Sequence, residues 1–240
     1  MRTLSLFTAL ACALLPGCSA PPAVPEKGES VIFVHGLGRT SASMETLASR
    51  VEDAGYQVIN FGYPSTSESI EQLTERLSAE VERSCGEERD HVHFVTHSMG
   101  GVLVRNYLSL SNPQHEGRVV MLSPPNQGSE IIDAFSDSPR VRSILGPAAM
   151  QLGTGEDGIA KQLGPVRFSL GVIMGDRSLS PLGSWLIPGP DDGKVAVDRA
   201  AVEGAVDFIV LHATHTFIMN RRDVAEEVLN FLEHGRFIER

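Results

Sequence analysis

The clearest chemical pattern in this sequence is in segment 91–101, where an apolar run ends in the residues THSMG at 96–100. Thr-x-Ser-x-Gly after an apolar run is typical of a nucleophile elbow, in which a serine sits on a strained turn from a strand into a helix. Small residues are needed two positions on either side of the serine. Gly100 meets this need, and Thr96 stands where glycine is usual. The expected chemistry is attack of Ser98 on a carbonyl carbon, with the N–H of Met99 stabilising the oxyanion.

A second oxyanion donor is expected from the loop after the first apolar run. Residues 30–34 read as a buried strand, and the next four residues are His-Gly-Leu-Gly. This pattern predicts a tight loop whose backbone N–H at Leu37 points to the oxyanion. A phosphate-binding loop is disfavoured because Ser41 stands where the third glycine of that fingerprint would be.

Two later segments offer an acid and a base. Asp192 lies in a Pro-Asp-Asp-Gly turn just before an apolar segment, and we favour it as the acid over Asp176 and Asp191. Asp176 is a rival because it ends the expected strand before it. His215 follows the last apolar run and is the expected base, and His212 is expected to be structural. A buried carboxylate would hold the base in the required tautomer.

The spacing of apolar residues predicts strands that alternate with helices. Helical spacing is found over residues 44–51, 70–81 and 224–232, and strands are expected near 56–61, 118–122, 167–175 and 206–211. This alternation favours a mostly parallel sheet with helices on both faces. Residues 128–164 are the least regular. Ile131, Ile132, Phe135, Ile144 and Leu145 in this region could line an acyl pocket or pack a connecting helix.

Together these motifs resemble the α/β-hydrolase superfamily, in particular bacterial lipases and esterases. The matching residues are HGLG at 35–38, THSMGG at 96–101, Asp192-Gly193-x-Val195, His215, and the segment 122–130. The resemblance implies an α/β-hydrolase fold and a serine hydrolase that cleaves carboxylic esters through an acyl-enzyme. It also implies a triad of Ser98, Asp192 and His215, an oxyanion hole at Leu37 and Met99, and no metal or cofactor. Acyl transfer and thioester hydrolysis are alternatives with the same triad, and a non-catalytic binding lipoprotein is another.

Composition and charge limit the classes of molecule that this protein is expected to bind. The 240 residues carry a formal net charge of −10, with 42% hydrophobic residues. An acidic chain without a basic run is not expected to bind nucleic acid. Nothing in the sequence indicates an oligomeric state. Cys85 is the only cysteine after residue 18, and we interpret it as a bystander.

The N-terminus predicts export. Residues 1–17 have a positive start and an apolar stretch too short to span a membrane, which is typical of a signal peptide. Leu-Pro-Gly-Cys at residues 15–18 resembles a bacterial lipobox, which implies lipidation of Cys18. Residues 18–29 would then be a lipid-anchored tether to a membrane, and residues 30–240 the catalytic domain. The expected location is the outer membrane of a Gram-negative bacterium. If cleavage follows Ala20 instead, the protein is periplasmic or secreted.

Overall fold

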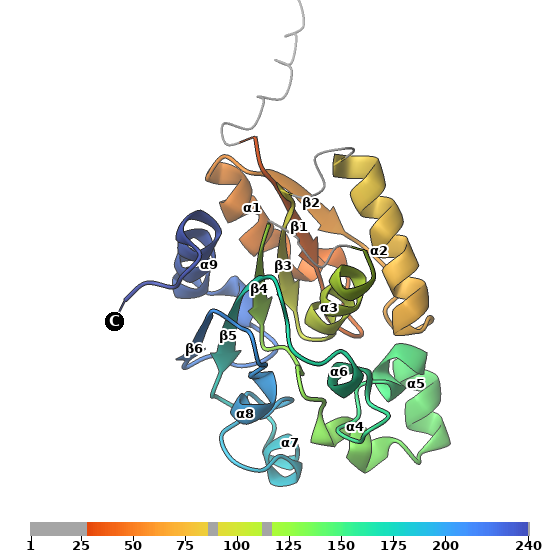
Figure 1. Cartoon of the computed structure of the whole chain (residues 1–240). Coiled ribbons are helices and arrows are strands. Elements are labelled where there is room, and N and C mark those ends of the chain that lie inside the picture. Colours follow the sequence, from red (N-terminus) through yellow and green to blue (C-terminus); the bar gives the residue numbers. More distant parts are fainter. Residues whose placement is uncertain (1–27, 86–90, 112–116, 240) are drawn as a thin grey trace, which may run out of the picture.

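The fold is built on one parallel sheet (Figure 1). The computed structural model describes residues 28–85, 91–111 and 117–239. The expected signal peptide and Cys18 lie outside these residues. Among them, six strands pair in the order β2-β1-β3-β4-β5-β6. Their bounds are β1 Ser30–Val34, β2 Gln57–Phe61, β3 His93–His97, β4 Arg118–Leu122, β5 Ser169–Gly175 and β6 Asp207–Leu211.

Helices fill most of the connections between the strands. Their bounds are α1 Glu45–Asp53, α2 Ile70–Cys85, α3 Met99–Ser111, α4 Glu130–Phe135, α5 Pro139–Met150, α6 Ile159–Gln162, α7 Pro181–Leu186, α8 Val197–Ala200 and α9 Arg222–His234. The expected strands and helices form close to their predicted positions, although β5 begins at Ser169 rather than Arg167. The order of strands and helices thus agrees with the predicted parallel sheet.

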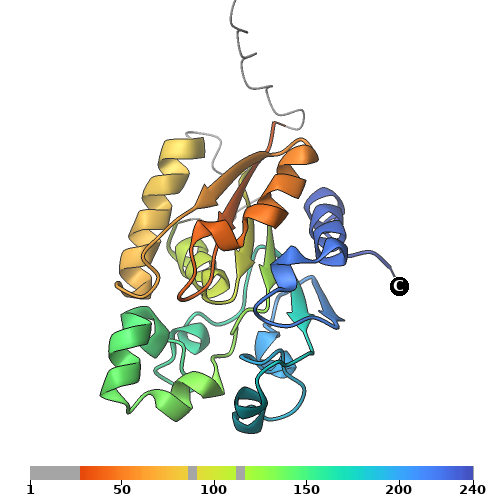
Figure 2. The same ribbon diagram turned by 180° about the vertical axis from the view of Figure 1, so that it is seen from behind.

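Apolar side chains on alternate strand positions divide the core into two layers. Val31 and Phe33 of β1 pack with α1 and α9 on one face of the sheet. Figure 2 shows these helices from the side opposite to that of Figure 1. Ile32 and Val34 of the same strand pack with α2 and α3 on the other face. Successive strand side chains point to opposite faces, so a continuous apolar strand needs helices on both sides. The sheet is therefore buried on both faces.

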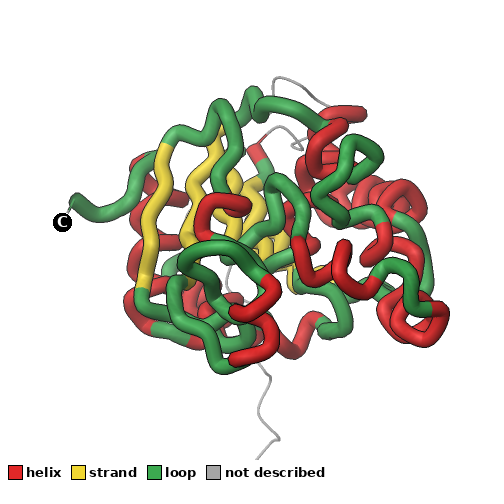
Figure 3. Tube along the Cα trace, turned by 90° about the horizontal axis from the view of Figure 1, so that it is seen from below, coloured by secondary structure: helices red, strands yellow, loops and turns green. Residues whose placement is uncertain are grey.

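Short helices gather at the carboxyl edge of the sheet. Residues 128–164 form α4, α5 and α6, and α7 follows β5 at the same edge (Figure 3). Helices α4 and α7 are in contact with each other. In parallel sheets ligands bind outside the carboxyl ends of the strands. This edge is therefore where a functional site is expected. Among the described residues, no helix has the length and apolarity needed to cross a membrane.

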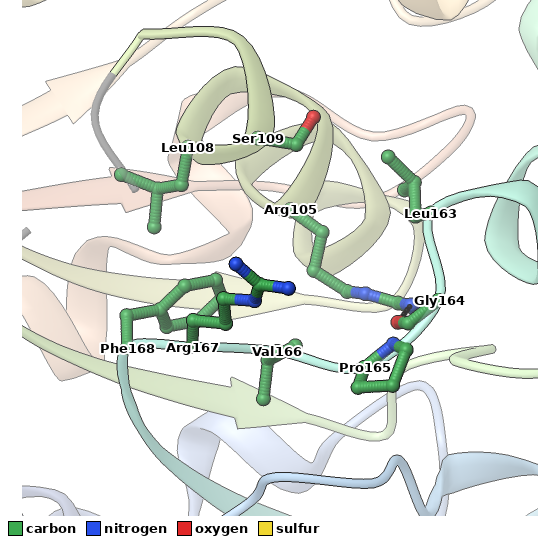
Figure 4. A pocket seen from close by; sticks show the side chains of 9 residues that line it. All are labelled: Arg105, Leu108, Ser109, Leu163, Gly164, Pro165, Val166, Arg167 and Phe168. Carbon is green, nitrogen blue, oxygen red and sulfur yellow. Dashed lines mark hydrogen bonds between the residues drawn. The ribbon is translucent and has the colours of Figure 1, made fainter. Parts of the chain in front are cut away.

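A buried arginine of α3 forms hydrogen bonds to the segments at the carboxyl edge of the sheet. Arg105 extends from α3 toward Gly164 beside a hollow of about 300 Å³ (Figure 4). Its guanidinium donates hydrogen bonds to the carbonyl oxygens of Asn126, Ala160 and Gly164 at 2.8–3.1 Å. It also donates to Asn126 Oδ1, so all these acceptors are uncharged. Burial lowers the pKa of Arg105 to about 10, which leaves it protonated at neutral pH. One side chain thus joins three segments.

Replacing Arg105 tests how much these hydrogen bonds contribute to stability. In Arg105→Met the carbonyl oxygens lose their donors inside the protein, and we expect the free energy of unfolding to fall by about 2–4 kcal/mol. Urea unfolding followed by circular dichroism measures this change.

Arg167→Met is the matched control, because Arg167 lines the same hollow but is exposed. We expect its effect to stay within about 0.5 kcal/mol. Equal stabilities for the two variants would show that Arg105 does not hold these segments together.

Candidate active site

Ser98 lies in the turn between β3 and α3 with a backbone φ of 54°. This left-handed conformation is unfavourable for a residue other than glycine. The turn is held by the N–H of Ser98, which donates to the carbonyl of Leu122 at 2.9 Å. A Cβ on Gly100 would lie 2.5 Å from the carbonyl oxygen of Val34 and 2.7 Å from that of His35. Glycine is required here because α3 passes directly against the end of β1.

The structure brings Ser98, His215 and Asp192 into one hydrogen-bonded chain. His215 Nε2 lies 3.0 Å from Ser98 Oγ, and His215 Nδ1 lies 2.7 Å from Asp192 Oδ2. With the proton on Nδ1, His215 donates to the carboxylate and accepts from the serine hydroxyl. His215 is 5% exposed and Asp192 1% exposed, so water is largely excluded from the two ionisable groups.

The loop after β5 fixes the Asp192 carboxylate. Its Oδ1 accepts hydrogen bonds from the backbone N–H groups of Lys194 and Val195 at 3.0 and 2.9 Å. The backbone N–H of His215 donates to the carbonyl of Asp192 at 3.0 Å. These bonds leave Oδ2 facing His215. The carboxylate is therefore oriented before any substrate binds.

The neighbouring Asp191 bonds to other groups than His215. Its Oδ1 accepts from the N–H of Gly193 at 2.6 Å and from Ser184 Oγ at 3.0 Å. Ser184 belongs to α7, so Asp191 ties this helix to the loop that carries Asp192.

The rival acid Asp176 pairs with the other histidine. Asp176 Oδ1 lies 2.9 Å from His212 Nδ1, and the two side chains are 38% and 73% exposed. They form a surface pair, separate from Ser98 and His215.

Two backbone N–H groups lie beside Ser98 without a partner among the described residues. These are the N–H of Leu37 and the N–H of Met99, the first residue of α3. A Cβ on Gly36 would lie 3.0 Å from the Ser98 Cβ, which shows how closely the loop after β1 approaches the serine. Both N–H groups therefore remain available as donors near Ser98.

Side chains from the loop after β2 support the Leu37 loop. The Tyr63 hydroxyl donates to the carbonyl of His35, and the two rings stack with centroids 4.1 Å apart. The N–H of Tyr63 donates to His35 Nε2 at 3.4 Å, so His35 Nδ1 donates to the carbonyl of Gly36 at 2.9 Å. Desolvation lowers the pKa of His35, which keeps this neutral tautomer. Ser65 Oγ accepts from the N–H of Gly38 at 3.0 Å.

His97 connects the turn at Ser98 to His215. Its Nε2 donates to the carbonyl of His215 at 2.9 Å. Burial lowers the pKa of His97 well below its ordinary value, and the nearby charges of His215, Arg39 and Lys194 lower it further. His97 is therefore neutral at pH 7, and its bond to the carbonyl selects the tautomer with the proton on Nε2.

A pocket of about 570 Å³ opens over Ser98 and His215. Its volume is typical of small-molecule sites. Much of the wall is apolar and comes from Ile131, Ile132, Phe135, Leu145, Leu152, Leu182, Leu186 and Val195. The irregular region 128–164 thus provides part of this wall. Ile144 does not line the pocket and is 70% exposed. No group of three or more His, Cys, Asp or Glu side chains within the described ranges is placed to hold a metal ion.

Several supporting residues were missed by sequence reasoning. Tyr63, Ser65 and Asp191 hold the loops around Ser98, but their contacts join residues that no local motif relates. Tyr63 and Ser65 follow an expected strand, and that position was their only signal.

Solved structures of lipases and of a phospholipase have the same fold. The mature form of Bacillus licheniformis lipase BlEst2 is 18% identical, with a TM-score of 0.68, over 92% of this chain and 96% of that one. The chain spans only 51% of the propeptide form of BlEst2. Paleococcus ferrophilus monoacylglycerol lipase is 18% identical, with a TM-score of 0.59, over 88% of this chain and 95% of that one. Phospholipase PlaB from Legionella pneumophila is 19% identical, with a TM-score of 0.60, over 71% of this chain and 45% of that one.

These likenesses confirm the predicted α/β-hydrolase fold. A comparison with curated proteins gave no match. The sequence model of the palmitoyl protein thioesterase family matches residues 30–156, slightly more than half of the chain, and this range contains β1, the Leu37 loop and the Ser98 elbow. The chain belongs to the palmitoyl protein thioesterase family and has the α/β-hydrolase fold.

Proposed function

We propose that this protein is a serine esterase in which Ser98, His215 and Asp192 are the catalytic triad. The observation that carries the proposal is the buried chain of hydrogen bonds from Ser98 Oγ through His215 to Asp192, with lengths of 3.0 and 2.7 Å. A serine bonded to a neutral imidazole, which is itself held by a carboxylate, is the arrangement that nucleophilic acyl transfer requires.

The proposed reaction has two steps. His215 Nε2 takes the proton of Ser98 as Oγ bonds to the acyl carbon, and the resulting imidazolium gives that proton to the leaving alcohol. Water then loses a proton to His215 and attacks the acyl-enzyme, and Ser98 recovers its proton as the acid leaves. Asp192 stays ionised and stabilises the imidazolium in both steps.

The N–H groups of Leu37 and Met99 are the proposed oxyanion donors. Each would bind the negative oxygen more tightly than the carbonyl oxygen of the bound ester. Loss of one such donor raises a barrier by about 3–4 kcal/mol in related chemistry. This makes the Tyr63 and Ser65 contacts that hold the Leu37 loop part of the machinery.

The substrate that fits is an ester of a medium or long acyl chain. The wall from α4 and α5 is apolar, and Leu182 lines the pocket while 65% exposed. Leu179 and Trp185, which precede the pocket-lining Ser180 and Leu186 in the sequence, are 63% and 81% exposed. Exposed apolar groups at the mouth of a pocket favour contact with aggregated lipid.

Thioester hydrolysis is the second candidate, and the family match favours it. The same acyl-enzyme forms from an oxygen ester or a thioester, since only the leaving atom differs. Acyl transfer would also use this intermediate, with an alcohol or amine in place of water. Hydrolysis rates for O-lauroyl ethylene glycol and S-lauroyl mercaptoethanol compare the two leaving atoms directly.

The triad predicts opposite results for two aspartates. Asp192→Asn should lower kcat for a p-nitrophenyl ester by about 10⁴-fold, because the amide holds the wrong tautomer of His215. Asp176→Asn is the matched control, because its carboxylate pairs with the exposed His212. We expect that variant to keep kcat within about threefold, since it touches only a surface pair. Steady-state kinetics and melting curves of both variants measure these effects.

A crippling Asp176→Asn with a mild Asp192→Asn would refute the assignment of the acid. A panel of p-nitrophenyl esters of rising acyl length, with Ser98→Ala as the inactive reference, tests the activity itself. No hydrolysis of any ester or thioester by the unmodified protein would contradict the proposed function.

We also propose that Cys18 carries a lipid anchor. The lipobox-like residues 15–18 and the proline-rich residues 21–29 support this, and both lie in the N-terminal part of the chain. Two or three acyl chains anchor a protein stably, because each buried CH₂ contributes about 0.8 kcal/mol. Cys18→Ser should move the protein from the membrane fraction to the soluble fraction or stall its processing. An unmodified mature N-terminus at Pro21, found by mass spectrometry, would rule the anchor out.

A further inference from the structure

The catalytic pocket of this acidic protein is lined by cations. The chain has 30 acidic and 20 basic residues. However, the charged side chains among the described pocket-lining residues are Arg39 and Lys194, and no carboxylate lines the pocket. Asp192 lies behind His215 and is 1% exposed. The charge at the pocket is thus opposite in sign to that of the whole chain.

Arg39 lines the pocket and is held beside His215. Its Nη2 donates to the carbonyl of Thr216 at 2.6 Å, directly after His215. The other nitrogen atoms of its guanidinium have no hydrogen-bond partner among the described residues. Because the proposed base gives its proton to the leaving group, a guanidinium held beside His215 is near the atoms that leave. Arg39 is half-buried, so solvent screens its charge less than that of an exposed arginine.

Lys194 brings a second charge to the same pocket. Its backbone is fixed, since its N–H donates to Asp192 Oδ1 and its carbonyl accepts from Ser129 Oγ at 3.1 Å. Its side chain is exposed and makes no ion pair within the described part of the chain. Both Arg39 and Lys194 lie near enough to His97 to disfavour its charged form. Their fields therefore reach the centre of the pocket.

The pocket is thus divided by chemistry. The wall from α4 and α5 is apolar and suits an acyl chain, whereas the loop after β1 supplies Arg39 and the loop that carries Asp192 supplies Lys194. We infer that Arg39 and Lys194 form an anion subsite for a phosphate group on the leaving group of the substrate. This inference rests on the proposed function, because it names the part of the ester that leaves from Ser98. A phosphate with two charges accepts hydrogen bonds from a guanidinium in a bidentate manner and attracts an ammonium at longer range.

Two sources of such a phosphate are chemically distinct. One is a glycerol phosphate ester, as in a lysophospholipid, and the other is a phosphopantetheine thioester. Two matched substrate pairs separate them. Octanoylglycerol 3-phosphate is compared with octanoylglycerol, and octanoyl phosphopantetheine with octanoyl pantetheine. Short acyl chains keep all four substrates in solution below the concentrations at which they aggregate.

The measured quantity is the ratio of kcat/KM for the phosphorylated substrate to that for its neutral partner. We expect a ratio of at least about ten in the unmodified protein for one pair or both, since hydrogen bonds between charged groups are strong. Arg39→Gln should lower that ratio by about tenfold, and Lys194→Gln by about threefold because its ammonium is exposed. Raising the salt from 50 to 500 mM should also lower it. The matched control is Lys161→Gln, an exposed lysine outside the catalytic pocket that pairs with Glu156.

The ratio separates recognition from positioning. If Arg39 only holds the Thr216 carbonyl, Arg39→Gln lowers kcat for both substrates of a pair equally and the ratio stays constant. A ratio near one in the unmodified protein, or a ratio unchanged in both pocket variants, overturns the subsite. Hydrolysis of the neutral substrates in that case leaves the proposed function standing. No hydrolysis of any of the four overturns the proposed function, and this inference with it.

Discussion

The site depends on the close contact between Gly100 of α3 and the carbonyl groups at the end of β1. A methyl group at this position would lie 2.5 Å from the carbonyl oxygen of Val34. Only glycine allows the helix to begin so near the strand, and this proximity gives Ser98 its left-handed backbone conformation with a φ of 54°. The strain of that conformation is offset by the packing of buried β3 and α3 on either side of the turn. The same contact places the start of α3 beside the loop that carries Leu37.

Hydrogen bonds between loops then assemble the rest of the site. His97 joins the elbow to His215, Asp192 joins the loop after β5 to the same histidine, and Tyr63 joins the loop after β2 to His35. Each link connects the ends of different strands, so the sheet order decides which loops meet. Desolvation lowers the pKa of His35 and of His97, so both stay neutral, and the neutral ring of His35 can accept the N–H of Tyr63 at Nε2. The groups around Ser98 are thereby oriented before a substrate arrives, which is the condition for strong electrostatic catalysis.

Much of this arrangement follows from local patterns. The apolar strands, the glycine after Ser98 and the order of serine, acid and histidine are each readable over a few residues, and the structure brings Ser98, Asp192 and His215 together. The supporting contacts are different in kind. Tyr63 meets His35 across 28 positions, and Arg39 meets Thr216 across 177, so neither pair forms a motif. The sequence also did not predict which side chains of the short helices would line the pocket. Ile144 and Leu145 are adjacent, yet of these two only Leu145 lines it. Such contacts depend on how segments pack rather than on what any one segment contains.

In the proposed reaction Ser98 carries the acyl group between the two steps. Rapid-quench mass spectrometry with a p-nitrophenyl ester in excess should detect this acyl-enzyme. We expect a transient mass increase equal to one acyl group, which peptide mapping assigns to the fragment containing Ser98. The same increase should be absent from Ser98→Ala. An acyl group on another residue, or acylation that persists in Ser98→Ala, would show that Ser98 is not the nucleophile.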